Sequence, residues 1–235
     1  MIKPQFVIGE IYHIYNRGVE KRNVFLKDSD FLRFIYDLSE FNDEGSAIPL
    51  KLRQNRYEVE PRTYSRLIIK KPLVDILAFS LMPNHFHLLL REKKEKGIIR
   101  FMQKLGTGYT MYFNKKQERV GSLFQGRFKA KLINREEYLE YILYYIHFNC
   151  LKLIDPKWSE KMIQDYQKAI NQLETYRWSS HLDYIGKRNF PSIIQRDFLL
   201  KIIGGEEKYK NTIEEWLKSI SQKIEIEEFR NLIIE

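Results

Sequence analysis

The sequence predicts an α+β protein built on one antiparallel sheet, and three observations carry this prediction. Short apolar runs at residues 6–17, 73–82, 86–90 and 129–133 are typical of strands. Apolar residues recur at helical spacing between the first two runs, and again between the last two. A further helical pattern follows the fourth run. The order strand, helix, strand, strand, helix, strand, helix favours a ferredoxin-like four-stranded antiparallel sheet with helices on its faces.

The first two predicted helices each show one apolar stripe. Asp28 or Ser29 is expected to cap the first helix. Its stripe consists of Phe31, Phe34, Ile35, Leu38 and Phe41. The second helix spans about residues 98–114, where Gly106 and Gly108 each weaken a helix by roughly 1 kcal/mol relative to alanine. We expect the two glycines to permit close backbone packing.

Length and composition indicate one domain with an appendage. The 235 residues divide into a predicted domain at 1–154 and a helical C-terminal extension at 155–235. A less regular stretch at about 43–72 interrupts the domain. Between residues 51 and 71 it holds seven Lys or Arg against two Glu, and on this excess of positive charge we expect it to contact DNA. From Gly204 onward there are eight Glu against five Lys or Arg. This acidic end is expected to pack on the domain or to self-associate into a homodimer rather than to grip DNA.

Two histidines share one face of the predicted third strand. His85 and His87 project side by side, while Phe86 and Leu88 point the other way, because side chains alternate along a strand. Neutral imidazole is a common metal ligand, so the pair would form half of a metal site. The alternative is a pair of histidines that merely hydrogen-bond to backbone groups.

A tyrosine-rich helix follows the fourth strand. It opens at Asn134 with a capping-box pattern, in which Glu137 stands three residues later. Tyr145 and Asn149 are four residues apart and therefore neighbours on one helix face. His147 lies between them on another face, which indicates a structural role. Taken alone, these residues favour core aromatics and an asparagine that ends the helix as a C-cap.

The net charge of +9 is unevenly distributed. Residues 91–131 contain twelve Lys or Arg against three Glu. Aromatic residues are interleaved with these cations: Phe101, Tyr109, Tyr112, Phe113, Phe124 and Phe128. Cations that follow a backbone, together with aromatic faces for stacking, are typical of single-strand nucleic-acid binding. A solvated face of an ordinary basic protein is the alternative.

Composition also argues against a secreted or membrane protein. The single cysteine, Cys150, rules out an internal disulfide framework and fits a reducing cytoplasm. No apolar run approaches the roughly 20 residues that a membrane span needs. The N-terminal residues lack the long apolar stretch of a signal peptide. We therefore expect a cytoplasmic protein with no membrane partner.

Six short motifs occur in an order that resembles a known family. They are Tyr15-Asn16-Arg17-Gly18, Leu81-Met82-Pro83-Asn84-His85-Phe86-His87, Tyr112-Phe113-Asn114, Leu123-Phe124-Gln125-Gly126-Arg127-Phe128, Tyr145-Ile146-His147-Phe148-Asn149, and Trp178-Ser179-Ser180 followed by Tyr184-Ile185-Gly186. The set is similar to the single-tyrosine, single-strand DNA transposases with a His-hydrophobic-His motif. The closer likeness is to the REP-associated tyrosine transposases, whose fold is the ferredoxin-like one.

The resemblance implies a nucleophile at Tyr145 and a divalent metal, Mg²⁺ or Mn²⁺, held by His85, His87 and Asn149. The ligand types would also accept Zn²⁺. One departure stands out, because the family usually has proline after the asparagine and this chain has Cys150. The helix is therefore expected to end differently.

The implied reaction cuts and rejoins single-stranded hairpin DNA through a 5′-phosphotyrosine and a free 3′-OH. Asn16 and Arg17, at the end of the first strand, and Arg127 and Lys129, before and within the fourth, are candidates for phosphate contacts. Two other functions stay open. One is a non-catalytic single-strand nucleic-acid-binding protein on the same fold, and the other is a metal-dependent phosphodiesterase that uses water in place of tyrosine.

Overall fold

A four-stranded antiparallel sheet forms the centre of the computed structural model, which describes residues 5–45, 71–156, 158 and 165–223. Its strands are β1 (Ile11–Arg17), β2 (Val74–Met82), β3 (His85–Glu92) and β4 (Lys129–Ile133). They lie in the order β2-β3-β1-β4, and every neighbouring pair is antiparallel. The predicted ferredoxin-like sheet is confirmed.

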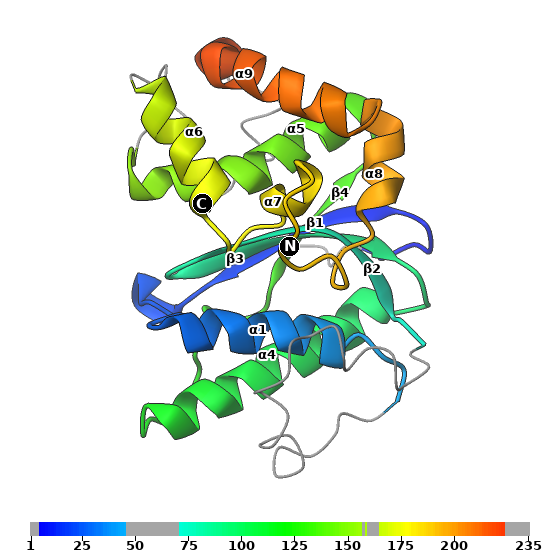
Figure 1. Ribbon diagram of the computed structural model, residues 1–235. Helices are drawn as coiled ribbons and strands as arrows, with labels where there is room; N and C mark the ends of the chain where they lie inside the picture. Colours follow the sequence, from blue (N-terminus) through cyan, green and yellow to red (C-terminus); the bar gives the residue numbers. More distant parts are fainter. Residues whose placement is uncertain (1–4, 46–70, 157, 159–164, 224–235) are drawn as a thin grey trace.

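Helices cover both faces of the sheet (Figure 1). On one face lie α1 (Asp28–Glu40) and α4 (Gly97–Lys116). The other face carries α5 (Glu136–Phe148), α6 (Tyr166–Thr175), α7 (His181–Tyr184), α8 (Arg196–Ile203) and α9 (Glu206–Lys223). Two short 3₁₀ helices, η1 (Val19–Lys21) and η3 (Asn149–Leu153), follow β1 and α5. The tyrosine helix and the C-terminal extension thus share one layer.

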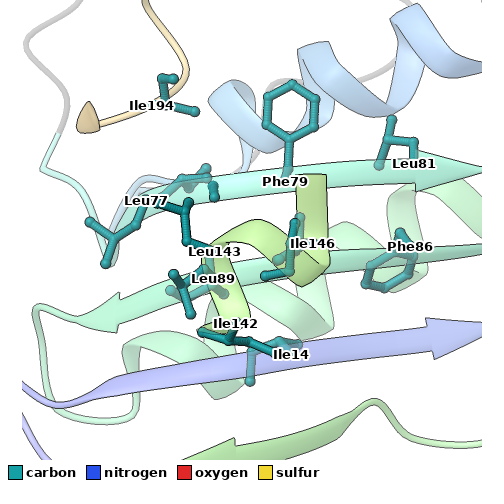
Figure 2. Close-up of a cluster of buried hydrophobic side chains, with 14 of the residues drawn as sticks. Ile14, Leu77, Phe79, Leu81, Phe86, Leu89, Ile142, Leu143, Ile146 and Ile194 are labelled. Atoms are coloured by element: carbon teal, nitrogen blue, oxygen red, sulfur yellow. The ribbon is translucent and has the colours of Figure 1, made fainter. Parts of the chain in front are cut away.

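The orientation of α5 is set by its apolar side. Ile142, Leu143 and Ile146 are fully buried and lie over the sheet (Figure 2). Removing such aliphatic side chains from water contributes about 1.5–3 kcal/mol each. Because the packing holds this face of α5 on β2 and β3, the rotation of the helix about its axis is determined, and with it the direction of Tyr145.

Three predicted boundaries are wrong in detail. β1 begins at Ile11 rather than at residue 6, because a turn with Gly9 at a φ of 91° precedes it. At the start of α1, neither Asp28 nor Ser29 is the cap. The N-cap is Lys27, and the Asp30 carboxylate accepts its backbone N–H at 3.1 Å.

The third wrong boundary is the start of α5. Asn134 does not cap this helix, whose N-cap is Arg135 with no side-chain hydrogen bond to the cap. Glu136 and Glu137 in the first turn instead stabilise the positive end of the helix dipole.

The two glycines of α4 have different surroundings. A Cβ on Gly108 would lie 2.3 Å from Phe41 Cζ, so the expected close packing is confirmed there. The same expectation is wrong for Gly106, where a Cβ would meet no atom within 4 Å.

A buried polar network joins the C-terminal extension to α5. Tyr209 Oη lies 2.7 Å from His147 Nδ1 and 2.8 Å from His181 Nδ1. His147 Nε2 lies 2.8 Å from Ser180 Oγ. The structural role expected for His147 agrees with these contacts, and the extension packs on the domain. Self-association and the division at residue 154 stay predictions.

The basic stretch expected to contact DNA lies mostly outside the described residues, since 46–70 are not described. Among the helices of the described part, none is long and apolar enough to span a bilayer.

Candidate active site

Strand β3 presents its two histidines next to each other, as predicted. The ring centroids of His85 and His87 are 5.1 Å apart. Each ring has a second contact that orients it. His85 Nδ1 lies 2.6 Å from Asn84 Oδ1 in the turn before β3, and His87 Nδ1 lies 2.8 Å from His13 Nε2 on β1. Both contacts use Nδ1, so the Nε2 atom of each ring is available for another partner.

Helix α5 brings the other two predicted residues to the same place. Asn149 Oδ1 lies 3.0 Å from His85 Nε2, and the Tyr145 ring centroid lies 5.6 Å from that of His87. The backbone at Asn149 is still helical, with φ −55° and ψ −32°, and the chain continues directly into η3. Cys150 permits this because, unlike proline, it keeps its N–H and does not force the preceding residue out of the helical region.

Burial keeps both histidines neutral. It lowers the pKa of His85 to about 4, opposed by the Asn149 contact and reinforced by the positive charges of Lys152 and Arg17. Burial also lowers the pKa of His87 well below its usual value. Neutral imidazole is the form that binds metal ions, so both histidines are in the protonation state that can bind a cation at physiological pH.

Three polar atoms of the site are buried without a hydrogen-bond partner among the described residues. They are His87 Nε2, Tyr145 Oη and Asn149 Nδ2. Such an orphaned atom costs about 1–3 kcal/mol. Burial raises the pKa of Tyr145 above its usual value, the Tyr141 hydroxyl adds to this, and the neighbouring Asn149 side chain counteracts it. A cluster of buried polar atoms without hydrogen-bond partners is typical of a ligand-binding site.

The donors present fit a divalent ion. Two ligands at about 2.1 Å from an octahedral ion lie about 3 Å apart when they are neighbours, which matches the 3.0 Å between His85 Nε2 and Asn149 Oδ1. His87 Nε2 would be the third donor. Within the described residues no three His, Cys, Asp or Glu side chains gather around one point. A three-ligand set in this place therefore depends on the amide of Asn149.

A pocket of about 500 Å³ opens beside the histidines. It is lined by His85 and His87 and by three of the four predicted phosphate contacts: Asn16, Arg17 and Lys129. Arg127, the fourth, lines a separate groove of about 860 Å³, and Asn16 lines both. Tyr145 is only 2 % exposed and does not line the pocket.

Two residues of the site escaped the sequence analysis. His13 was hidden in the first strand, although its alternation with Tyr15 places both side chains on one sheet face, where their rings stack with centroids 5.1 Å apart. Lys152 lines the pocket in η3, and burial lowers its pKa to about 8. In the sequence, the only indication that Lys152 belongs to the site is its position three residues after Asn149.

Comparison with known proteins decides which family this site resembles. The model of the family "Transposase IS200 like" matches residues 51–149, a segment that contains His85, His87, Tyr145 and Asn149. Over this segment the chain is similar to IS200-like transposases, which agrees with the resemblance that the six sequence motifs show.

Two solved structures similar to this chain are transposases by name. One is a REP-associated tyrosine transposase bound to a REP hairpin, with 13 % identity over 80 % of this chain and 86 % of that one, at a TM-score of 0.46. The other is a putative transposase from Deinococcus radiodurans R1, with 14 % identity over 62 % of this chain and 95 % of that one, at a TM-score of 0.33. No curated protein matches the chain.

Proposed function

We propose that this protein is a metal-dependent transposase that cleaves and rejoins single-stranded hairpin DNA through a 5′-phosphotyrosine at Tyr145. The observation that carries the proposal is the gathering of the buried Tyr145 hydroxyl, two neutral histidines and the Asn149 amide in one cluster. Nucleic-acid binding alone requires none of these groups. The IS200-like match over the same segment supports a DNA-cleaving activity.

His85, His87 and Asn149 would hold Mg²⁺ or Mn²⁺. When bound, this ion supplies Lewis-acid polarisation of the scissile phosphate. His13 holds the His87 ring in place through its contact at Nδ1, and Asn84 does the same for His85. The protein thus fixes both imidazoles before any ligand arrives.

The bond changes involve Tyr145 and one phosphodiester. Tyr145 Oη forms a bond to phosphorus, and the bond from phosphorus to the 3′ oxygen breaks. The phenol loses one proton and the departing 3′ oxygen gains one, so the proton count is unchanged. Attack of another 3′-OH on the phosphotyrosine reverses these steps and joins two strands without a nucleotide cofactor.

Cations of the pocket would hold the phosphate during this exchange. Arg17, Lys129 and Lys152 line the pocket beside His85, so their charges offset the phosphate charge. Tyr145 is buried in this structure, and the Trp158 ring stacks on its ring with the two centroids 6.2 Å apart. Attack therefore requires the side chains between Tyr145 and the pocket to move. We place this activity in the cytoplasm, and a homodimer is compatible with it.

The test is a covalent adduct between the protein and DNA. The full chain is incubated with single-stranded hairpin DNA from the repeats flanking its gene, with Mn²⁺ or Mg²⁺, and run on a denaturing gel. A slower band that needs the metal and disappears in Tyr145→Phe is expected. Tyr144→Phe is the matched control, because this neighbour on α5 stacks on Tyr209 and Trp216, away from the histidines.

The same gel separates the other two functions. Cleavage that survives in Tyr145→Phe would point to water or to another tyrosine, such as Tyr141 or Tyr144, as the nucleophile; cleavage without any covalent adduct would indicate water. Tight binding without cleavage at confirmed metal occupancy, on several hairpins, would establish a non-catalytic binding protein.

A further inference from the structure

A second groove lies next to the histidine pocket, between α4 and residues 121–128. Its volume is about 860 Å³, and Asn16 is part of the lining of both hollows. Its apolar wall includes Phe34, Phe86, Met102, Leu105, Phe124 and Phe128. Thr107, Thr110 and Gln103 add hydrogen-bonding groups. A mostly apolar hollow with a few polar groups is the usual form of a ligand site.

Gly106 of α4 lines this groove without serving the packing of the protein. A glycine inside a helix weakens it relative to alanine. At Gly108, two residues further along α4, the lack of a side chain serves packing, because Phe41 occupies the space that a Cβ would need. A Cβ on Gly106 would meet nothing within 4 Å. The space beside Gly106 is therefore open, and a ligand in the groove could occupy it.

The charge of the groove favours an anionic ligand, such as a nucleic acid, over a cation. Arg127 lines it, and no carboxylate among the described residues does. The connection through Asn16 leads to Arg17 and Lys129, which line the neighbouring pocket. A strand whose phosphates contacted these cations would therefore pass beside the groove at Asn16.

We infer that the groove takes an unpaired nucleobase of the bound single strand, next to the phosphate that lies in the histidine pocket. This inference rests on the proposed function for its partner, single-stranded DNA, but not on cleavage. Aromatic and apolar walls bind bases of single strands by stacking, and the flanking hydroxyl and amide groups of Thr107, Thr110 and Gln103 can hydrogen-bond to base edges.

The experiment fills the groove without harming the fold. Gly106→Met adds a side chain into the open space and replaces glycine by a good helix former. Gly106→Ala is the matched control, because it makes the same backbone change and adds only one methyl group. Both variants are expected to raise Tm by about 2–4 °C. A loss of DNA binding in the methionine variant therefore cannot come from unfolding.

Binding is measured by fluorescence anisotropy with a labelled hairpin that carries mixed-sequence single-stranded flanks. All proteins carry Tyr145→Phe, and chelator removes metal, so cleavage does not interfere. Gly106→Met is expected to weaken binding about tenfold or more, the range in which loss of one stacked base falls. Gly106→Ala is expected to stay within about twofold of the parent. The salt dependence is expected to be the same in all three, because no phosphate contact changes.

An abasic scan of the flanks identifies the base. In the parent, removing the base at one position is expected to weaken binding about tenfold, and the same removal is expected to have no further effect in Gly106→Met. Unchanged affinity in Gly106→Met, or an identical abasic pattern in both proteins, would overturn the inference. The adduct gel tests cleavage separately. If the protein forms no adduct but shows this abasic pattern, the inference about base binding in the groove stands and the proposed cleavage reaction is wrong.

Discussion

His13 Nε2 lies 2.8 Å from His87 Nδ1, and both rings are buried. The two residues are 74 positions apart and meet because β1 pairs with β3, with Tyr15 directly opposite His87. A neutral imidazole carries one N–H. Only when His87 Nδ1 donates to His13 does His87 Nε2 keep a lone pair for a metal ion. Metal binding at His87 Nε2 therefore requires His13 Nε2 to accept this hydrogen bond, which then holds His87 in the tautomer that can act as a ligand.

Removing His13 is expected to weaken metal binding. His13→Phe keeps a ring but loses the acceptor, so the affinity for Mn²⁺ should fall about 10- to 100-fold. Titration calorimetry of the DNA-free protein measures it. His13→Gln, whose amide oxygen can still accept, should restore part of the affinity. His181→Gln alters a buried histidine of the other network and should leave Mn²⁺ affinity unchanged. Parental affinity in His13→Phe would contradict this role.

Acid is expected to destabilise the fold through its buried histidines. Burial lowers the pKa of His181 to about 3 and that of His85 to about 4, and it lowers the pKa values of His87 and His147 well below the usual value. In the unfolded chain they bind a proton near pH 6.5. Below that pH the unfolded state therefore binds more protons, and the free energy of unfolding falls as pH falls.

Each such histidine contributes up to about 1.4 kcal/mol per pH unit. Urea unfolding of the metal-free protein between pH 7.5 and 4.5, at constant ionic strength, measures the slope. His181→Gln should reduce that slope by one histidine's share, because glutamine does not titrate. A free energy of unfolding that stays constant over this range would refute the prediction.

Tyr209 is expected to matter for stability through its hydroxyl alone. Its Oη contacts two buried imidazoles, His147 and His181. Tyr209→Phe keeps the stacking on Tyr144 but leaves both nitrogens unpaired, so the free energy of unfolding should fall by about 1–3 kcal/mol. Tyr138→Phe is the control, since its hydroxyl accepts an exposed hydrogen bond from Arg135 and its loss should cost within about 0.5 kcal/mol. Equal stability of the two variants in urea would rule out the network as a support of α5.

Lys152 is expected to bind a phosphate of the DNA. It lines the pocket beside His85. Lys152→Met keeps the length of the side chain and removes the charge, so DNA affinity should fall and the slope of log K against log salt should decrease by about one. Lys187, which pairs with Glu174 at 2.8 Å on the C-terminal extension, provides the control Lys187→Met. An unchanged salt slope in Lys152→Met would remove Lys152 from the DNA-binding surface.

Much of the fold followed from periodicity. Strands and helices were predictable because burial of one side chain in two, or of one helix stripe, leaves its mark on the order of residues. The exceptions were ends of elements. The turn at Gly9 delays the start of β1. At the start of α1 the Asp30 carboxylate, rather than the side chain of Asp28 or Ser29, accepts the free backbone N–H of the N-cap. Such ends depend on single hydrogen bonds, which compete within about 1 kcal/mol and leave no periodic signal.

The sequence by itself determined which groups of the candidate site are neighbours along one element. The two-residue period of a strand puts His85 and His87 on one face, and the four-residue step of a helix puts Tyr145 beside Asn149. Only the tertiary structure decided that these two pairs meet, because the burial of Ile142, Leu143 and Ile146 against the sheet sets the rotation of α5. Pairing of β1 with β3 likewise brought His13 to His87. Contacts between distant segments follow from the packing of whole faces, which no short stretch of sequence encodes.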